Sequence, residues 1–196
     1  MPSSPRTLPE LLALAAREAP EAEAFRYRAE RLTYADWDAL AGRVADGLAT
    51  RGVRRGDVVA LLLPSTPFYL LAYLGVARLG AVATGINIRY RRGEIGHILR
   101  RAGASVLLAV EGWHDADFRT VLGSLRPELP ELRDVVWLAA DALRASSVAA
   151  VTDLAGGAAT PAIAAAADDP VAIVFTSGTT GVPKGAWYTH RSLLAL

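Results

Sequence analysis

Apolar residues follow helical spacing over the first fifty positions of the chain. Thr7-Leu-Pro-Glu10 is a capping-box pattern and predicts a helix start, since leucines and alanines then recur at helical intervals. A second start is predicted at Thr33, with Asp36 in the acidic position of the box. The apolar face of this second helix comprises Trp37, Leu40, Ala41, Val44 and Leu48. Between the two helices, EAFRYR and RLTY are predicted to form a short strand pair.

Beyond residue 50 the pattern changes to short, continuous apolar runs that follow glycines. Gly52 precedes DVVALLL, Gly80 precedes AVATGI and Gly103 precedes ASVLLAV. Such runs are typical of parallel strands buried on both faces, and a glycine just past a helix end provides a left-handed cap. Helices are predicted between the runs, at Pro67 to Leu79 and Arg92 to Ala102. Alternating strands and helices predict an α/β fold, with layered helices around a largely parallel sheet.

The stretch from 139 to 167 departs from this pattern. Alanine fills 14 of its 29 positions, and two glycines and a proline interrupt any long helix. It is predicted to be a low-complexity connector with a short helix near Asp141. Strands are predicted on either side of it, in DVVWLA and VAIVF.

Composition narrows the classes of function. The 196 residues are 52% hydrophobic with a formal net charge of +1, which indicates a globular chain and gives no reason to expect a nucleic-acid partner. The absence of cysteine excludes disulfides and thiolate metal sites, and the three histidines are too scattered in sequence to predict a metal cluster. His97 is predicted to have a packing or surface role, and His114 to lie in a loop.

No targeting or membrane segment is expected. The N-terminus lacks the basic and apolar regions of a signal peptide. One long apolar stretch, residues 68–86, is interrupted by Arg78 and is predicted to be a buried helix followed by a strand. We therefore expect a cytoplasmic protein without a transmembrane segment.

The segment TSGTTGVPKG, residues 176–185, carries the clearest chemical pattern. It contains three glycines, four hydroxyl groups and the only lysine of the chain, Lys184. Glycines let several backbone N–H groups converge on one point, and the hydroxyls add further donors. A lysine contributes a compact point charge, whereas an arginine would impose a broad planar fork. The segment therefore predicts a site for oxyanions.

This segment is not a Walker A phosphate loop. Gly178 lies six residues before Lys184, as in that motif, but the second glycine is Gly181 and does not adjoin the lysine. Pro183 precedes the lysine, and Gly185 follows it in place of Ser or Thr. A strand is predicted next, so the loop joins two strands. A nucleoside triphosphatase of the P-loop type is consequently a disfavoured alternative.

FTSGTTGVPKGAWYTH resembles the signature loop of the adenylate-forming superfamily, which includes acyl-CoA synthetases, peptide-synthetase adenylation domains and luciferases. The serine, both threonines, the glycines, the Pro-Lys pair and the Thr-His ending fall in register. Residues 32–99 are similar to the N-terminal region of that family. The resemblance implies that residues 1–196 form an incomplete N-terminal domain, with the alanine-rich connector at 139–167 inside it and the C-terminal domain absent.

The resemblance implies a two-step acid–thiol ligase. A small-molecule carboxylic acid attacks ATP to give an acyl-adenylate and pyrophosphate, and a thiol, most commonly coenzyme A, then accepts the acyl group. His190 would lie in the substrate pocket. The residues that would hold the ATP phosphates are Thr176, Ser177, Gly178, Thr179, Thr180, Gly181 and Lys184.

Other parts of the family's machinery have no counterpart in this sequence. The Mg²⁺ ligand, the ribose-binding aspartate, the hinge and the catalytic lysine would lie beyond Leu196, so the 196-residue chain alone is expected to be inactive. A truncated, non-catalytic remnant or a nucleotide-binding module is the alternative. The identity of the acid, and whether the thiol belongs to coenzyme A or a carrier protein, stay open.

Overall fold

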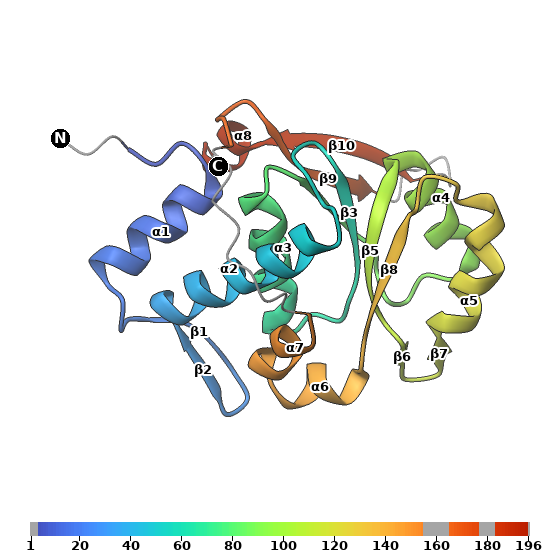
Figure 1. The fold of residues 1–196 in the computed structure, drawn as a ribbon, viewed down its shortest axis with the longest axis horizontal. Coiled ribbons are helices and arrows are strands. Elements are labelled where there is room, and N and C mark those ends of the chain that lie inside the picture. Colours follow the sequence, from blue (N-terminus) through green and yellow to red (C-terminus); the bar gives the residue numbers. More distant parts are fainter. Residues whose placement is uncertain (1–3, 155–164, 177–182, 196) are drawn as a thin grey trace.

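A six-stranded sheet forms the centre of the molecule, in the order β10–β9–β4–β3–β5–β8 (Figure 1). The computed structural model describes residues 4–154, 165–176 and 183–195. Neighbouring strands of the sheet are parallel except β9 and β10, which are antiparallel. The predicted α/β fold with a largely parallel sheet is confirmed. The strands are β3 (Val58–Leu62), β4 (Val82–Gly85), β5 (Ala104–Val110), β8 (Asp134–Leu138), β9 (Pro170–Thr176) and β10 (Lys184–Thr189).

Helices cover both faces of this sheet (Figure 1). On one face lie α1 (Leu8–Glu18), α2 (Tyr34–Thr50) and α3 (Pro67–Arg78). The other face carries α4 (Arg92–Ala102) and α5 (Phe118–Leu125). Strand β3 is apolar and buried at every position because it is central and covered on both sides.

Shorter elements complete the described chain. A peripheral hairpin comprises β1 (Glu23–Tyr27) and β2 (Glu30–Thr33), and a second one comprises β6 (Gly112–Trp113) and β7 (Ala116–Asp117). A 3₁₀ turn, η1 (Arg126–Glu128), follows α5. The remaining helices are α6 (Ala140–Ala145), α7 (Ser147–Leu154) and α8 (His190–Leu194).

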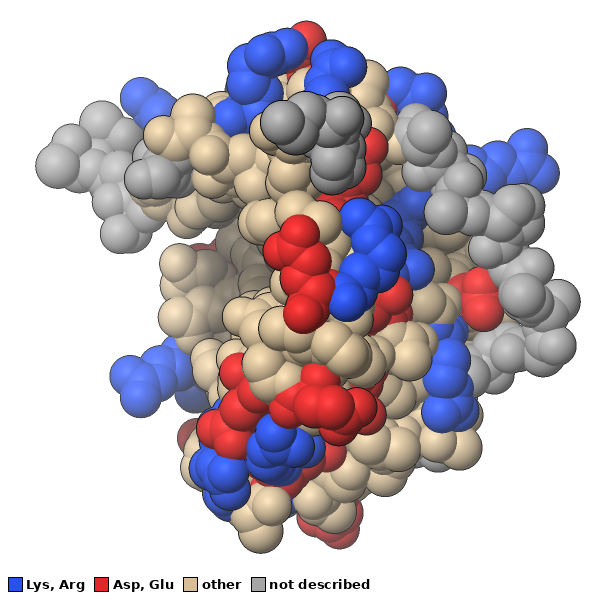
Figure 2. Space-filling view, turned by 90° about the vertical axis from the view of Figure 1, so that its left-hand side faces the viewer, with Lys and Arg blue, Asp and Glu red and all other residues tan. Residues whose placement is uncertain are grey.

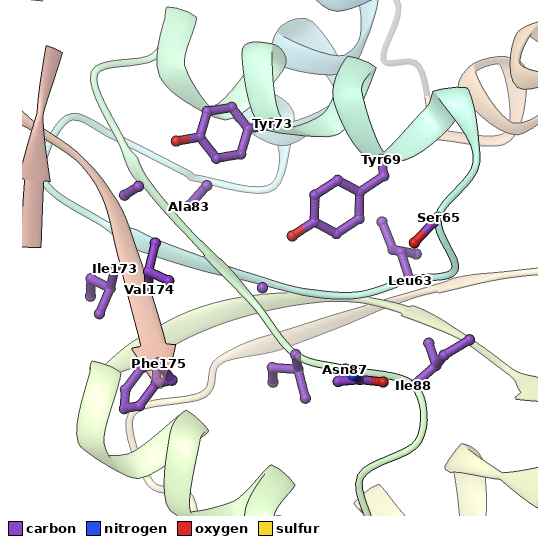
Figure 3. Close-up of a pocket in the computed structure, with 13 residues that line it drawn as sticks. Leu63, Ser65, Tyr69, Tyr73, Ala83, Asn87, Ile88, Ile173, Val174 and Phe175 are labelled. Atoms are coloured by element: carbon purple, nitrogen blue, oxygen red, sulfur yellow. The ribbon is translucent and has the colours of Figure 1, made fainter. Parts of the chain in front are cut away.

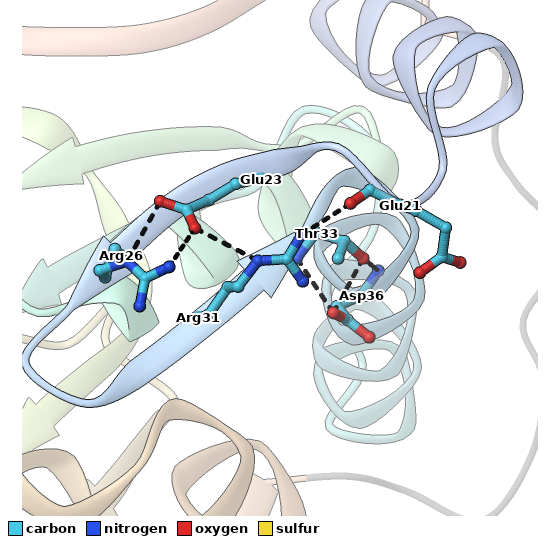
Figure 4. A network of polar contacts seen from close by, with 6 residues as sticks. All are labelled: Glu21, Glu23, Arg26, Arg31, Thr33 and Asp36. Atoms are coloured by element: carbon cyan, nitrogen blue, oxygen red, sulfur yellow. Dashed lines mark hydrogen bonds and ion pairs between the residues drawn. The ribbon is translucent and has the colours of Figure 1, made fainter.

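Both predicted capping boxes form. The Thr7 hydroxyl accepts a hydrogen bond from the Glu10 N–H, and the Glu10 carboxylate accepts one from the Thr7 N–H. Thr33 and Asp36 make the same reciprocal pair, so aspartate serves here in place of glutamate (Figure 4). The backbone hydrogen bond from Thr33 is the main reason that the pKa of Asp36 is lowered.

Predicted glycine positions also take up the left-handed conformation. Gly52, Gly80 and Gly103 have φ values of 78°, 65° and 63°. A residue with a Cβ would be strained at these angles, whereas glycine adopts them freely. Each of the three glycines lies between a helix and the buried strand that follows it, which explains their spacing in the sequence.

Charges on the hairpin β1–β2 are paired locally. Glu23 contacts Arg26 at 2.6 Å and Arg31 at 3.2 Å, and Arg31 also donates to the carbonyl oxygen of Glu21 (Figure 4). The hydrogen bond from Arg26 is the largest cause of the lowered pKa of Glu23. Acidic and basic side chains lie intermixed on the face seen in Figure 2. Exposed pairs of this kind contribute little to stability.

The alanine-rich stretch differs from its prediction as a connector with one short helix. It carries two helices, α6 and α7, and the second of these contacts α2 and α3. Ala150, Val151 and Leu154 have no exposed surface, so α7 contributes to the core. Alanine is a strong helix former, and an apolar face of small residues hides the helical period. Positions 155–164 of the predicted connector lie outside the described residues.

The apolar stretch 68–86 divides between α3 and β4, as the interruption at Arg78 predicted. Among the described residues, no helix has the length and apolar character needed to cross a bilayer.

Candidate active site

The glycine-threonine segment joins the two antiparallel strands of the sheet. Thr176 ends β9, Lys184 begins β10, and these two residues are directly paired across the strands. The strands predicted on either side of the segment are therefore present, and their pairing brings Lys184 beside Thr176. The other residues predicted to hold phosphates lie outside the described part of the chain, namely Ser177, Gly178, Thr179, Thr180 and Gly181.

Topology places this segment at the carboxyl edge of the parallel strands. Strand β9 runs parallel to β4, and β4 runs parallel to β3. The end of β9 at Thr176 therefore points the same way as the ends of these strands at Leu62 and Gly85. In open α/β sheets ligands bind outside this edge. Residues just after β3 and β4, such as Ser65 and Asn87, are thus neighbours of the site.

A cationic hollow of about 640 Å³ lies on the α4 side of β9 and β10. Lys184 and Arg101 contribute the positive charges, and Trp187, which is 60% exposed, contributes an aromatic surface. We call this feature the lysine hollow. Its lining residues are His97, Arg101, Ile173, Phe175, Pro183, Lys184, Gly185 and Trp187.

A second cavity, of about 360 Å³, lies between α3 and the ends of β4 and β9 (Figure 3). Tyr69 and Tyr73 extend into it from α3, opposite Val174 and Phe175 of β9. We call it the tyrosine cavity. A mostly apolar lining with a few polar groups is typical of small-molecule sites. Its lining residues are Leu63, Ser65, Tyr69, Tyr73, Ala83, Gly85, Ile86, Asn87, Ile88, Ala172, Ile173, Val174 and Phe175.

Both tyrosines are uncharged hydrogen-bonding groups at physiological pH. Burial raises the pKa of Tyr73 to about 12, with a smaller contribution from Tyr69, and burial also raises the pKa of Tyr69. A methyl group built on Gly85 would overlap the Tyr69 hydroxyl, so the phenol reaches over β4 only because this residue is glycine. The cavity therefore offers hydroxyl groups to a bound molecule without any charge of its own.

Sequence reasoning missed the tyrosine cavity. The helix α3 is apolar around most of its circumference, so its aromatic residues were indistinguishable from core residues. Two tyrosines four positions apart, together with a glycine at the end of the next predicted strand, are the signal that could have indicated it.

His190, predicted to be a substrate-pocket residue, begins α8 and is 1% exposed. Its Nδ1 atom lies 3.2 Å from the backbone nitrogen of Leu8, the first residue of α1. Because an N–H group only donates, Nδ1 is the acceptor and carries no proton. Burial lowers the pKa of His190, while Asp169 and Glu10 oppose that shift. His190 lines neither the lysine hollow nor the tyrosine cavity, and its role in the substrate pocket stays a prediction.

His97 has more specific contacts than the predicted packing or surface role implies. Its Nε2 atom lies 2.9 Å from the carbonyl oxygen of Pro183, and its ring meets Phe175 edge-on at 6.4 Å. Phe175 immediately precedes Thr176, and Pro183 immediately precedes Lys184. Thr176 and Lys184 are the paired ends of residues 176–184, which we call the phosphate segment because of their predicted role. The sequence could not indicate these contacts because Pro183 is 86 positions further along the chain.

Within the described ranges, no group of three or more histidine, aspartate or glutamate side chains could hold a metal ion.

Comparison with known proteins agrees with the predicted family. The family model of AMP-binding enzymes matches residues 12–196. The chain is 37% identical over 164 residues to the long-chain-fatty-acid–CoA ligase FadD13 of Mycobacterium tuberculosis, covering 83% of this chain and 30% of that protein. It is also 37% identical over 166 residues to 4-coumarate–CoA ligase 5 of Oryza sativa, covering 84% of this chain and 29% of that protein.

Solved structures give the same result. The N-terminal domain of FACL13 from Mycobacterium tuberculosis, with an inhibitor bound, matches with a TM-score of 0.78 and 33% identity, over 94% of this chain and 44% of that chain. A putative long-chain-fatty-acid CoA ligase from Rhodopseudomonas palustris matches with a TM-score of 0.81 and 28% identity, over 96% of this chain and 46% of that one.

This chain spans about a third of the length of the curated relatives that it matches, with 30% and 29% for the two named above. Nearly all of its own length, by contrast, falls within the AMP-binding family model. The signature loop, the upstream similarity and the parallel sheet that carries the loop all agree with that match. The chain therefore belongs to the family of AMP-binding, adenylate-forming enzymes.

Proposed function

We propose that this chain is the N-terminal part of an acid–thiol ligase that converts a carboxylic acid and ATP to an acyl-adenylate and pyrophosphate. The acyl group then passes to a thiol, for which coenzyme A is our proposal because the similar proteins named above are CoA ligases. The observation that carries the proposal is the pairing of Thr176 with Lys184 at the carboxyl edge of the sheet, beside an apolar cavity.

The phosphate segment would act through electrostatics. Negative charge accumulates on pyrophosphate as it leaves, so donors and cations already in position favour that state. Lys184 provides the ammonium, and Thr176 with the residues 177–181 provides hydroxyl and backbone donors. Mg²⁺ would enter with ATP as part of the substrate.

The tyrosine cavity would hold the acyl part of the substrate. Its apolar lining favours an alkyl or aryl chain, and the neutral Tyr69 and Tyr73 hydroxyls can donate to a carboxylate or acyl oxygen without opposing charge. Names of similar proteins include ligases for long-chain fatty acids, 4-coumarate and hydroxybenzoates, so both alkyl and aryl acids are candidates.

A pyrophosphate-exchange assay on the intact gene product tests this proposal, after its mass has been measured. We expect radiolabel from pyrophosphate to enter ATP only when one acid of a panel is present, with octanoate, palmitate, benzoate and 4-coumarate as members. Hydrolysis of Mg·ATP in the absence of any acid would favour a nucleoside triphosphatase, and no exchange with any acid would favour a nucleotide-binding module. We also propose that the purified 196-residue chain alone shows no exchange, and a signal from it would overturn that part.

The variant Lys184→Arg tests the phosphate segment within the same assay. A guanidinium keeps the charge but requires more room than an ammonium, so exchange is expected to fall by about tenfold or more. The matched control is Arg191→Lys, because Arg191 pairs with Asp168 on an exposed surface away from the loop. Equal rates for Lys184→Arg and the wild type would contradict the role of Lys184.

A further inference from the structure

His97, on a separate element, contacts Phe175 and Pro183, the residues that precede the two paired ends of the phosphate segment. It lies in the middle of α4, half-buried, with Ile95 and Ile98 fully buried on either side of it. The helix has a left-handed glycine cap at Gly103 and approaches α5 closely at Gly96, where a methyl group would meet Leu125 at 2.8 Å. The imidazole is thus held on a packed helix and not on a loop.

The hydrogen bond to Pro183 has a defined direction. A carbonyl oxygen only accepts, so Nε2 of His97 must donate across the 2.9 Å to it. This carbonyl belongs to the same planar peptide group as the N–H of Lys184. A hydrogen bond that holds the Pro183 carbonyl in one direction therefore also orients the backbone N–H of Lys184.

The second contact of His97 is with Phe175 of β9, the strand paired with β10. The imidazole ring meets the Phe175 ring at an interplanar angle of 83°, an edge-to-face geometry that aromatic pairs prefer. Phe175 immediately precedes Thr176, just as Pro183 immediately precedes Lys184. One side chain consequently contacts the residue before each of the two paired ends of the segment.

We propose that His97 is a positioning residue for phosphate binding, which holds the Pro183–Lys184 peptide so that the Lys184 ammonium faces the nucleotide. This inference rests on the proposed function and adds a residue to it. His97 transfers no proton in this role, since both the neutral Nε2–H form and the imidazolium donate the same hydrogen bond. Arg101 and Lys184 line the same hollow and remain the groups that carry charge.

Two substitutions remove the two contacts of His97 one at a time, the ring contact with Phe175 and the hydrogen bond to Pro183. The variant His97→Gln retains an N–H donor at a similar reach and loses the ring. The variant His97→Phe retains the ring against Phe175 and loses the donor. As a matched control, His114→Asn replaces a histidine in the β6–β7 turn, where φ is 54° and asparagine is tolerated.

The measurement is the dissociation constant of the intact gene product for ATP and for AMP, by calorimetry with Mg²⁺ present. AMP lacks the β- and γ-phosphates, so only the constant for ATP depends on the segment. We expect His97→Phe to weaken ATP binding about three- to tenfold, the range for loss of one hydrogen bond, and to leave AMP binding unchanged. The variants His97→Gln and His114→Asn are expected to stay within about twofold of the wild type for both nucleotides.

The other possible results distinguish failure of the inference about His97 from failure of the proposed function. Wild-type ATP affinity in His97→Phe would overturn the inference and leave the proposed function standing. Equal weakening of ATP and AMP would indicate a general structural role and would likewise overturn it. An equal loss in His97→Gln and His97→Phe would contradict the hydrogen bond as the relevant contact. If the wild type binds no ATP, the proposed function fails and this inference fails with it.

Discussion

The buried imidazole of His190 joins the first and last helices of the described chain, through its hydrogen bond from Leu8. Leu8 opens α1, so its N–H has no partner within the helix. We expect His190→Phe to lower the free energy of unfolding by about 1–3 kcal/mol, because the donor is then left without an acceptor. Asparagine can place an oxygen near the position of Nδ1, so His190→Asn should lose less. Urea denaturation at neutral pH measures both, and equal losses would contradict the hydrogen bond.

The lowered pKa of His190 also predicts a pH dependence. Below its ordinary value of 6.5 the unfolded chain takes up a proton that the folded chain still resists. Unfolding is therefore favoured as the pH falls through that range towards the lowered folded pKa, and the stability is fully present above it. Comparing urea midpoints of wild type and His190→Asn at pH 7.5 and 5.5 isolates this group, since all other groups are shared. Identical pH slopes in the two proteins would exclude the effect.

At the scale of elements, α2 and α3 pack closely where Gly75 faces Val44. A methyl group on Gly75 would lie 2.5 Å from Val44 Cγ1 and 3.2 Å from the Ala41 carbonyl oxygen. The branched Val44 side chain is fully buried and has little freedom to move. We expect Gly75→Ala to destabilise by about 1–3 kcal/mol, even though alanine favours helices by about 1 kcal/mol.

A second glycine provides the control for that prediction. Gly123 lies in α5, and nothing approaches within 4 Å of a methyl group built on it. Gly123→Ala should therefore stabilise by about 0.5–1 kcal/mol, with only the helix propensity acting. Thermal unfolding of both variants distinguishes the two effects. Combining Gly75→Ala with Val44→Ala should recover part of the loss, and strict additivity would show that the two residues do not compete for space.

Local signals explain which elements the sequence alone could predict. The boxes at Thr7 and Thr33 and the left-handed glycines depend on residues within a few positions of each other, and all were confirmed. Helix α7 was missed because alanine makes an apolar face that resembles a connector. The contact of His97 with Pro183 depends on two segments meeting in space, and periodicity carries no information about such pairs.

At the scale of the whole molecule, α1 and the strands that carry the phosphate segment share a second, smaller core. Buried residues of α1, α2, α3 and β9 form it, with Tyr188 of β10 and Leu193 of α8 packed against it. The ends of the described chain are thereby joined to the candidate active site. The buried members of this cluster are Leu12, Ala41, Leu74, Ala77, Val171 and Ala172.

Because of this shared core, we expect a substitution in α1 to lower the local stability of β9 and β10. Leu12 is 4% exposed within the cluster, so Leu12→Ala should cost about 2–4 kcal/mol through lost burial and a cavity. Backbone hydrogen exchange should accelerate in residues 170–176 and 184–194 more than in β3 and β5, which belong to the main core. Leu11→Ala is the control, because Leu11 is 42% exposed on the same helix and should change stability by no more than about 0.5 kcal/mol. Uniform acceleration across all strands would instead indicate one cooperative core, in which the first helix has no particular connection to the strands of the site.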